Sequence, residues 1–165
     1  MELRKFKESD SNEILTWIEN EREFRLWSAD RYDSYPIKAE NINLNYKKCS
    51  ELGDFYPMTL IDEENNVIGH LILRNPNNNL SQIRLGFIIV NKKIRGKGYG
   101  KILIEKAIKF AKEELNASEI NLGVFSTNEN AYKCYKACGF EEVKTIKNAY
   151  KFNEEYWDCI KMILK

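Results

Sequence analysis

Residues Ile83–Leu115 read IRLGFIIVNKKIRGKGYGKILIEKAIKFAKEEL and contain, in order, an apolar strand, a glycine-rich turn and a long helix. The strand is expected to end at Val90, and the turn Arg95–Gly100 has glycine at every second position. Glycine adopts positive φ angles without steric cost and lets the backbone approach a ligand closely. Because a helix follows directly, its free N–H groups and the positive end of its dipole face out of the turn. The stretch therefore predicts an anion site that suits a pyrophosphate.

Basic residues surround this turn, and no acid intervenes before Glu105: Lys92, Lys93, Arg95, Lys97 and Lys101. The P-loop pattern G-x-x-x-x-G-K-[ST] does not match, because Ile102 follows Gly100 and Lys101. A dinucleotide fingerprint needs G-x-G-x-x-G almost directly after a strand, whereas the spacing here is G-x-G-x-G and five residues separate Val90 from Gly96. The remaining match is R-G-x-G-x-G after a strand that ends in valine. This pattern resembles motif A of the GCN5-related N-acetyltransferases (GNAT), which are acyl-CoA-dependent transferases.

A second stretch supports the resemblance. Residues 128–140 read NENAYKCYKACGF and are similar to the N-x-x-A-x-x-x-Y-x-x-x-G-F pattern of motif B in the same family. Two independent motifs with the expected gap between them are more specific than either motif alone. The resemblance covers residues 83–140 directly and the rest of the chain through the order of strands and helices. It predicts an acetyl-CoA-dependent N-acetyltransferase acting on an amine.

The resemblance also implies where the cofactor binds. Acetyl-CoA is expected between two parallel strands that splay apart, with its pantetheine arm hydrogen-bonded along one of them like an added strand. That strand contributes Ile88, Ile89 and Val90, and the other spans residues 122–125. The backbone amides of the turn would hold the pyrophosphate: Arg95, Gly96, Lys97, Gly98, Tyr99 and Gly100. Asn128 matches the asparagine that contacts the pantetheine arm, and no metal is expected.

Tyr135 matches the tyrosine that lies near the thioester sulfur in this family. When a neutral amine attacks the thioester carbonyl, a backbone N–H of the strand ending at Val90 can stabilise the developing oxyanion. The departing CoA thiolate needs a proton, and a phenol with a pKa near ~10 holds one at pH 7 and can deliver it. Tyr135 is therefore the predicted general acid. Its alternative is a structural tyrosine packed on a helix face.

The sequence identifies no general base. N-terminal acetyltransferases of ribosomal proteins that resemble this fold carry a glutamate five residues before the motif B asparagine, but Gly123 stands at that position, and the motif A strand offers Arg84 rather than a carboxylate. Candidates without a motif behind them are Glu23, Asp30, His70 and Asp158, and a water chain is the alternative. His70 suits a structural role at least as well. The missing glutamate weakens the case for protein N-termini as substrates and leaves a non-catalytic acyl-CoA-binding module as the alternative function.

Composition predicts one packed domain over residues 1–165, with 43% hydrophobic and 12% aromatic residues. The net charge of +1 indicates no strong nucleic-acid partner, and no stretch approaches the roughly 20 apolar residues of a membrane span. Residues 1–80 carry 15 acids and 10 bases, whereas residues 81–165 carry 10 acids and 16 bases. The basic half suits a phosphate-rich cofactor, and the acidic half suits a cationic acceptor such as an amine.

The four cysteines form no C-x-x-C pair, and the charged N-terminus is not a signal peptide, so a reduced cytoplasmic protein is expected. Cys134 and Cys138 lie at i, i+4 on a predicted helix and are expected to pack in the core. The acceptor stays open, since a small amine, an antibiotic, a polyamine, a free amino acid or a protein lysine all fit. Exposed edge strands and an aromatic C-terminal segment leave room for a homodimer.

Periodicity outside the motifs predicts the remaining elements. Helices are expected after a cap at residues 9–11, over residues 37–52 and after a capping box at residues 126–129, and strands over residues 2–7, 55–61, 67–74, 140–146 and 156–164. Residues 21–35 mix aromatics with charges and either cover the acceptor site or pack a helical layer onto the sheet. The fold class is thus α/β (α+β), a GNAT-like fold: a mixed, mostly antiparallel twisted sheet of six or seven strands, with splayed parallel central strands and flanking helices.

Overall fold

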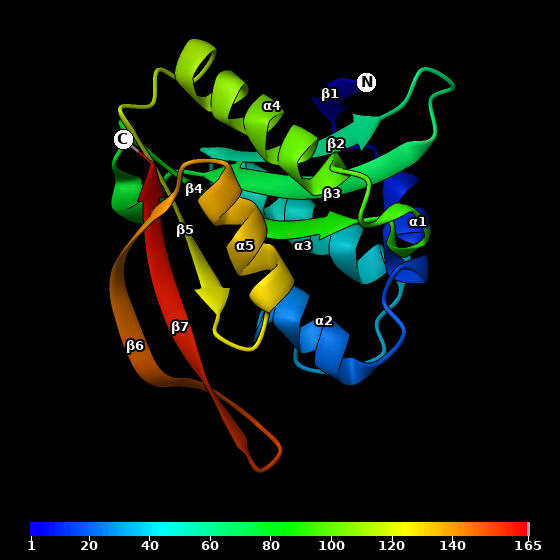
Figure 1. Ribbon diagram of the computed structural model, residues 1–165. Helices are drawn as coiled ribbons and strands as arrows, with labels where there is room; N and C mark the ends of the chain where they lie inside the picture. The colour runs from blue at the N-terminus through cyan, green and yellow to red at the C-terminus, as the bar shows by residue number, and fades with distance from the viewer. Residues whose placement is uncertain (165) are drawn as a thin grey trace.

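The computed structural model describes residues 1–164, which form a seven-stranded mixed sheet with helices on both faces (Figure 1). The strand order is β1-β2-β3-β4-β5-β7-β6. The strands are β1 (Glu2–Lys5), β2 (Phe55–Ile61), β3 (Val67–Arg74), β4 (Gln82–Val90), β5 (Glu119–Phe125), β6 (Glu141–Phe152) and β7 (Glu155–Leu164). The helices are α1 (Asp10–Thr16), α2 (Glu21–Ser28), α3 (Ala39–Glu51), α4 (Tyr99–Glu113) and α5 (Glu129–Ala137), with short 3₁₀ turns at Pro76–Asn78 and Lys92–Ile94.

The topology agrees with the predicted one. Strands β1 to β4 pair in order as an antiparallel meander, and α4 crosses over to β5, which pairs with β4 in parallel. A crossover helix is what a parallel connection requires. Strand β7 then pairs antiparallel with both β5 and β6. No helix within residues 1–164 combines the length and the apolar character needed to cross a bilayer.

Two apolar cores lie on the opposite faces of the sheet, because neighbouring residues of a strand point to opposite faces. Leu71 and Leu73 of β3 pack in the core that α4 and α5 cover, together with Leu103 and Ile104. Ile72, between the two leucines, packs in the core that α1, α2 and α3 cover. Aromatic residues of the segment 21–35 belong to this second core, so the segment does pack a helical layer onto the sheet.

Strands β4 and β5 pair along only part of their length. The parallel register joins Gln82, Ile83 and Arg84 to residues 119–121 and then stops, so the strands part over the following residues. A β-bulge in β4 adds to the divergence: the register with β3 shifts between His70 and Ile72, and Phe87 has a φ of +50°. Bulges bend a strand and re-aim its side chains and backbone. The predicted splay between the parallel strands is present.

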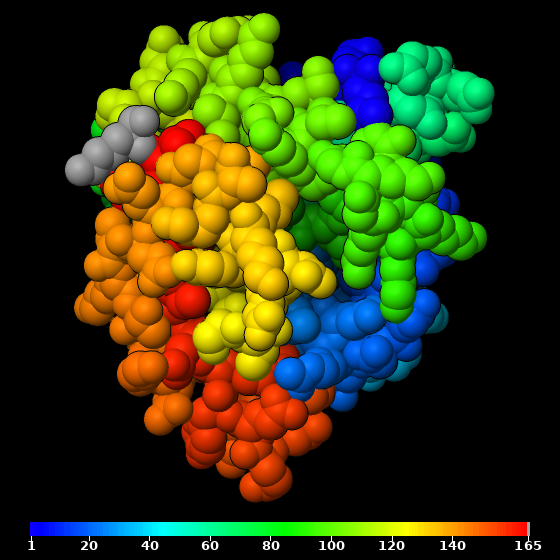
Figure 2. All heavy atoms as spheres, in the orientation of Figure 1, coloured from blue at the N-terminus to red at the C-terminus, as the bar shows by residue number. Residues whose placement is uncertain are grey.

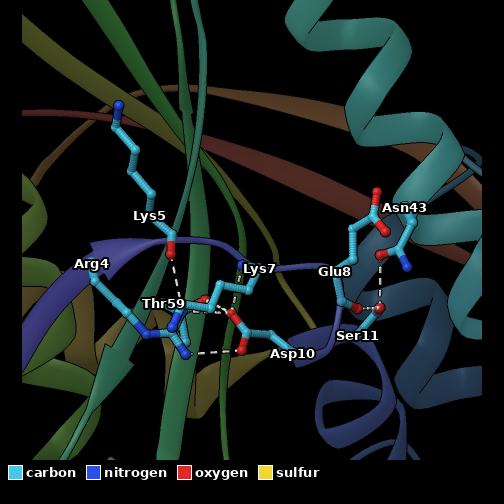
Figure 3. A network of polar contacts seen from close by, with 8 residues as sticks. All are labelled: Arg4, Lys5, Lys7, Glu8, Asp10, Ser11, Asn43 and Thr59. Atoms are coloured by element: carbon cyan, nitrogen blue, oxygen red, sulfur yellow. Dashed lines mark hydrogen bonds and ion pairs between the residues drawn. The ribbon is translucent and has the colours of Figure 1, made fainter.

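The ends of two helices differ from the predicted caps. Helix α1 has no side-chain cap from Ser9; instead the Asp10 carboxylate accepts the Lys7 N–H at 2.9 Å, both Arg4 guanidinium nitrogens at 2.8 and 2.9 Å, and the Thr59 hydroxyl at 2.8 Å (Figure 3). This buried network connects β1, α1 and β2. Helix α5 starts after Asn128, not after a capping box that begins at residue 126.

Candidate active site

A cavity of about 570 Å³ lies where β4 parts from β5. Figure 2 shows its mouth as a hollow between the green residues that follow β4, the yellow start of α5 and the blue helix α2. It is lined by Trp17, Ile18, Glu23, Leu26, Trp27, Ile88, Ile89, Val90, Arg95, Gly96, Gly98, Tyr99, Gly100, Lys101, Ile104, Asn128, Asn130, Ala131, Cys134 and Tyr135. Tyr135 and all of the predicted cofactor residues except Lys97 are among them.

The glycine-rich turn forms one wall of this cavity. Gly96 and Gly98 have φ angles of +79° and +84°, in the left-handed region where a side chain is strained. Gly98 is the N-cap of α4, so the unsatisfied first-turn N–H groups of α4 begin at Tyr99. Gly100 permits close packing instead, since an added Cβ would lie 3.4 Å from the Cys134 sulfur. The turn thus brings a helix N-terminus to the cavity, as an anion site requires.

The basic residues around the turn are less free than the sequence indicated. Lys92 pairs with Glu19 and, at 3.1 Å, with Glu23, so its charge is neutralised by the α1–α2 region. Lys101 lies 3.6 Å from Glu105, one helical turn along α4. Two of the five basic residues around the turn are therefore already paired with carboxylates, whereas the first N–H groups of α4 have no partner within the helix.

The Arg95 side chain folds back onto the end of β4, where its Nε donates to the Val90 carbonyl at 3.2 Å. Asn128 uses its side-chain oxygen as the N-cap of α5, accepting from the Ala131 N–H at 3.4 Å. Its amide nitrogen makes no hydrogen bond to other side chains or backbone within residues 1–164 and can serve a ligand. Asn128 thus both starts the helix and lines the cavity.

Tyr135 lies deep in the cavity with only 6% of its surface exposed. Burial raises its pKa well above the ordinary value of 10, so the phenol stays protonated at neutral pH. One residue away, Cys134 also lines the cavity, although the sequence predicted a core position for it. Interaction with the Cys138 thiol lowers the pKa of Cys134 to about 7 and raises that of Cys138.

A second cavity of about 420 Å³ adjoins the first, and the two share Leu26, Trp27, Ile88, Asn128 and Tyr135 in their walls. Its other walls come from the loop after α2 and from strands β3, β4, β5 and β7. The Trp27 indole N–H donates to the Phe87 carbonyl at 2.9 Å and so ties α2 to the bulge of β4. Tyr135 therefore stands where the two cavities meet.

Basic side chains dominate the second cavity: Arg31, Arg74, Arg84 and Lys161 line it, with Asp30 as the single acid among its lining residues. Asp30 is exposed, whereas the four cations are half-buried. The division of charge along the sequence predicted a cationic acceptor from the acidic N-terminal half. That prediction does not fit this cavity, because Arg31 and Arg74 come from the acidic half and face it beside Arg84 and Lys161.

Two of the candidate bases line a cavity. Glu23 lines the first, but Lys92 and the Glu19 N–H hold its carboxylate. Burial raises the pKa of Glu23, and these two contacts outweigh burial and keep the pKa below its usual value. Asp30 lines the second cavity at its exposed side.

The other two candidate bases lie outside both cavities. His70 is fully buried, stacks on Tyr46 and shares a 2.8 Å hydrogen bond with the Tyr46 hydroxyl. Burial lowers the His70 pKa to about 3, so this residue is a neutral part of the core. Asp158 pairs with Lys147 at 2.8 Å and accepts the Asn148 N–H at 2.9 Å.

Sequence reasoning missed several lining residues, because no motif marks them. Trp17 belongs to the helix expected after residues 9–11. Trp27 belongs to residues 21–35, whose aromatics had two interpretations, and it packs in the core and also lines the cavity. Arg74 ends a strand that reads as ordinary sheet, and Lys161 belongs to the last strand. In the sequence, only Arg84, which the motif A strand offers in place of a carboxylate, indicated that this part of the site is basic.

Comparison with known proteins agrees with this geometry. The model of the acetyltransferase (GNAT) family matches residues 13–140. A spermidine N(1)-acetyltransferase of Vibrio cholerae is 26% identical over 164 residues, which are 98% of this chain and 91% of the relative. An N-alpha-acetyltransferase of Saccharolobus solfataricus is 30% identical over 152 residues, 81% of this chain and 90% of the relative.

The fold is shared with a crystal structure of spermidine N-acetyltransferase from Vibrio cholerae in complex with CoA and spermine. Its TM-score is 0.84 at 24% identity, over 99% of this chain and 94% of that one. That likeness concerns the fold. The match of the family model over residues 13–140 covers both glycine turn and motif B helix. The chain belongs to the acetyltransferase (GNAT) family.

Proposed function

We propose that this GNAT N-acetyltransferase moves an acetyl group from acetyl-CoA to a primary amine by direct attack in a ternary complex. The observation that carries the proposal is the position of Tyr135, whose buried phenol lines both cavities at their junction. Acetyl-CoA would occupy the first cavity and the amine the second. Related proteins named as spermidine and N-alpha-acetyltransferases support transfer to nitrogen.

The first cavity fits a CoA thioester in three ways. The N-terminus of α4 suits a pyrophosphate, held by the amides of Arg95–Gly100. The unpaired edge of β4 at Ile88, Ile89 and Val90 suits the amide groups of pantetheine, which would add to it like a strand. Asn128 offers a further amide donor beside the junction. The solved relative with bound CoA and spermine has the same fold, which supports this assignment.

Bound acetyl-CoA supplies a thioester whose carbonyl carbon accepts the amine nitrogen. A backbone N–H of the Ile88–Val90 segment would donate to the carbonyl oxygen as negative charge develops there. As the N–C bond forms and the C–S bond breaks, the Tyr135 phenol donates its proton to the sulfur, and Tyr135 regains a proton from the amine nitrogen directly or through water. The net result is one N–H proton moved to sulfur, so the step balances without another reactant.

The first experiment is calorimetric titration of the purified protein with acetyl-CoA, CoA and ATP in parallel. We expect micromolar binding of both CoA species and much weaker binding of ATP, because ATP has no pantetheine arm for β4. Thiol release is then measured with a panel of primary amines. Absence of CoA binding would mean that the Arg95–Gly100 turn only starts a helix, and this result would overturn the proposal.

The panel of amines also distinguishes an active acetyltransferase from the alternative function. A protein that binds acetyl-CoA but releases no thiol with any amine would be a non-catalytic acyl-CoA-binding module. Gly123, which stands where N-terminal acetyltransferases of ribosomal proteins have a glutamate, is the feature that favours this outcome. The retained Tyr135 at the junction favours turnover.

A further inference from the structure

The second cavity contains four cations that come together from four separate parts of the chain. Arg31 follows α2, Arg74 ends β3, Arg84 lies in β4 and Lys161 lies in β7. Arg74 and Arg84 are register partners in neighbouring strands, so their side chains leave the sheet side by side. Lys161 is opposite Gly123 in the β5–β7 ladder, and its Nζ lies 3.3 Å from the place that a Cβ on Gly123 would take.

None of these cations forms an ion pair with a carboxylate within residues 1–164. The Arg84 Nε donates to the Asn121 side-chain oxygen at 2.8 Å, which orients the guanidinium and leaves its terminal nitrogens for another partner. Arg31 lies over the Phe87 ring at 5.1 Å, and its Nη1 lies 3.7 Å from the Cys49 sulfur. The Arg74 side chain has no hydrogen-bond partner among the described residues.

Unpaired charges in a partly buried site destabilise a fold, so a protein normally pairs them. Here burial and the charges of Arg84 and Arg31 lower the pKa of Arg74, which means that the three guanidinium groups repel one another in the folded state. Such a cluster is stabilised when an anion binds, and arginine offers planar donor pairs that match carboxylate and phosphate oxygens. A polyamine would add positive charge to the same space.

We infer that the acceptor is a small primary amine that carries an anionic oxygen group, a carboxylate or a phosphate, rather than a polyamine. This inference rests on the proposed function, because it assigns the second cavity to the acceptor. The anionic end pairs with the Arg74–Arg84 pair and with Arg31 and Lys161. The amine end then lies toward Tyr135, at the junction with the first cavity.

The same charges help the amine to react. A positive environment disfavours the ammonium form and lowers the amine pKa, so that a larger fraction is the neutral nucleophile. The four cations thereby perform part of the task of the general base that neither motif supplies. Exposed Asp30 is the one carboxylate among the lining residues of the second cavity, and it would receive the proton that the ammonium loses, through water.

Matched acceptors test the inference in a thiol-release assay with acetyl-CoA. β-Alanine is compared with β-alaninamide, 2-aminoethyl phosphate with ethanolamine, and spermidine is the polycation. We expect the anionic member of a pair to have the higher kcat/KM by about 10- to 100-fold, as hydrogen bonds to a charged group imply. The two pairs distinguish carboxylate from phosphate. A preference for spermidine or for the members that lack the anionic group would overturn the inference and leave the proposed function intact.

Substitutions at Arg74 test whether the cations of the second cavity cause this preference among acceptors. Arg74→Gln should lower the ratio of kcat/KM between acceptors with and without the anionic group about tenfold. Arg74→Lys should restore part of this ratio, and Lys112→Gln on the exposed surface of α4 should leave it unchanged. An unchanged ratio in Arg74→Gln would contradict the inference. Arg74→Gln should also raise the melting temperature, since it relieves repulsion in the unliganded cavity, and such a rise excludes misfolding as the cause.

A binding measurement separates the two proposals. In the presence of CoA, 2-aminoethyl phosphate or β-alanine should raise the melting temperature of the wild type more than that of Arg74→Gln. If this difference is seen while no amine supports thiol release, transfer fails and the anion site stands. If thiol is released with amines that lack an anionic group while neither 2-aminoethyl phosphate nor β-alanine stabilises the wild type, transfer stands and the anion site is refuted.

Discussion

The two cavities that meet at Tyr135 are built in different ways. Most walls of the first come from one continuous segment, from the end of β4 through the glycine turn into α4, with α5 opposite. The walls of the second come from the loop after α2 and from four strands that are far apart in the sequence. The first offers mainly backbone groups, and the second offers charged side chains.

In the proposed function, this difference assigns the cofactor mainly to backbone groups and the acceptor to side chains. A pyrophosphate needs free amides at a helix N-terminus, which the spacing of Gly96, Gly98 and Gly100 provides whatever the neighbouring side chains are. The proposed acceptor meets the charges of the second cavity, and these depend on single side chains such as Arg74 and Lys161. The mutations below affect one cavity, the other or their junction.

The largest effect is expected at the junction. Tyr135→Phe removes the proton donor but keeps the ring in the core, so kcat should fall by about 10²-fold or more while acetyl-CoA affinity changes little. Stopped-flow thiol release and calorimetry measure the two quantities. Tyr132→Phe is the control, since Tyr132 lies on the same helix with its hydroxyl on Glu142 and outside both cavities. Equal turnover of the two variants would mean that Tyr135 is not the general acid.

Lowering the pH should decrease the free energy of unfolding through His70, which lies outside both cavities. Unfolded chains bind a proton on histidine below about pH 6.5, whereas buried His70 has a pKa of about 3. The unfolded state therefore binds more protons between these values, and stability falls as the pH is lowered through this window. From pH 7 to pH 5 the free energy of unfolding should drop by about 2 kcal/mol.

Urea titrations at several pH values check this loss. Several carboxylates have a lowered pKa, among them Asp10 and Glu23 with ordinary values of 3.8 and 4.5, and these groups add their own losses of stability at lower pH. His70→Gln keeps a partner for the Tyr46 hydroxyl and should flatten the dependence between pH 7 and pH 5. A wild-type profile that is already flat there would mean that His70 is not buried as a neutral ring.

A third experiment compares two glycines with the same backbone conformation. Gly98→Ala puts a side chain at a φ of +84°, which costs about 1–2 kcal/mol and displaces the turn. Acetyl-CoA affinity should fall about tenfold. Gly53→Ala, at a φ of +80° with open space around it, should lower the melting temperature to a similar extent and leave affinity unchanged. Similar affinity losses in both variants would indicate general destabilisation.

The smallest effect is expected in the second cavity. Gly123→Glu introduces a carboxylate beside the Lys161 ammonium, which would compete with an anionic acceptor. Because one partly exposed ion pair contributes at most about 1 kcal/mol, KM for the acceptor should rise about threefold, with acetyl-CoA affinity unchanged. Gly123→Gln is the matched control for size. If both variants raise KM equally, bulk rather than charge is responsible.

The fold was predicted almost completely from sequence. The meander, the α4 crossover, the bounds of β2 and β3 and the end of α5 before Gly139 all follow from local signals: alternation of apolar residues, a glycine with a φ of +92° and a long amphipathic helix. The errors lie at the bounds of other elements: β1 ends at Lys5 rather than at residue 7, β6 continues to Phe152 rather than ending at residue 146, and α1 lacks a side-chain cap from Ser9. Asp10 is buried under Arg4 and Thr59 and so acts as a partner for other strands, which no local pattern reveals.

The site was predicted in part. Sequence analysis named Tyr135 and the turn, and the structure places them, Lys97 apart, in one cavity. It overestimated the free charge around the turn, because the ion pairs of Lys92 with α1–α2 carboxylates join residues about seventy positions apart. The cationic acceptor predicted from the acidic N-terminal half stays a prediction, because a sum of charges over half a chain does not tell which side chains share a surface, and Arg31 and Arg74 of that half line the second cavity.

The backbone of the first cavity follows from the sequence alone: a strand, glycines in left-handed conformations and a helix N-terminus follow one another along the chain, so local sterics are enough to build them. The cation cluster of the second cavity, to which the proposed function assigns the acceptor, depends on the tertiary fold. Arg31, Arg74, Arg84 and Lys161 become neighbours because β4 parts from β5 beyond Arg84 and because the strands pair in a particular register. Register and splay arise from packing across the whole sheet, and no short segment encodes them.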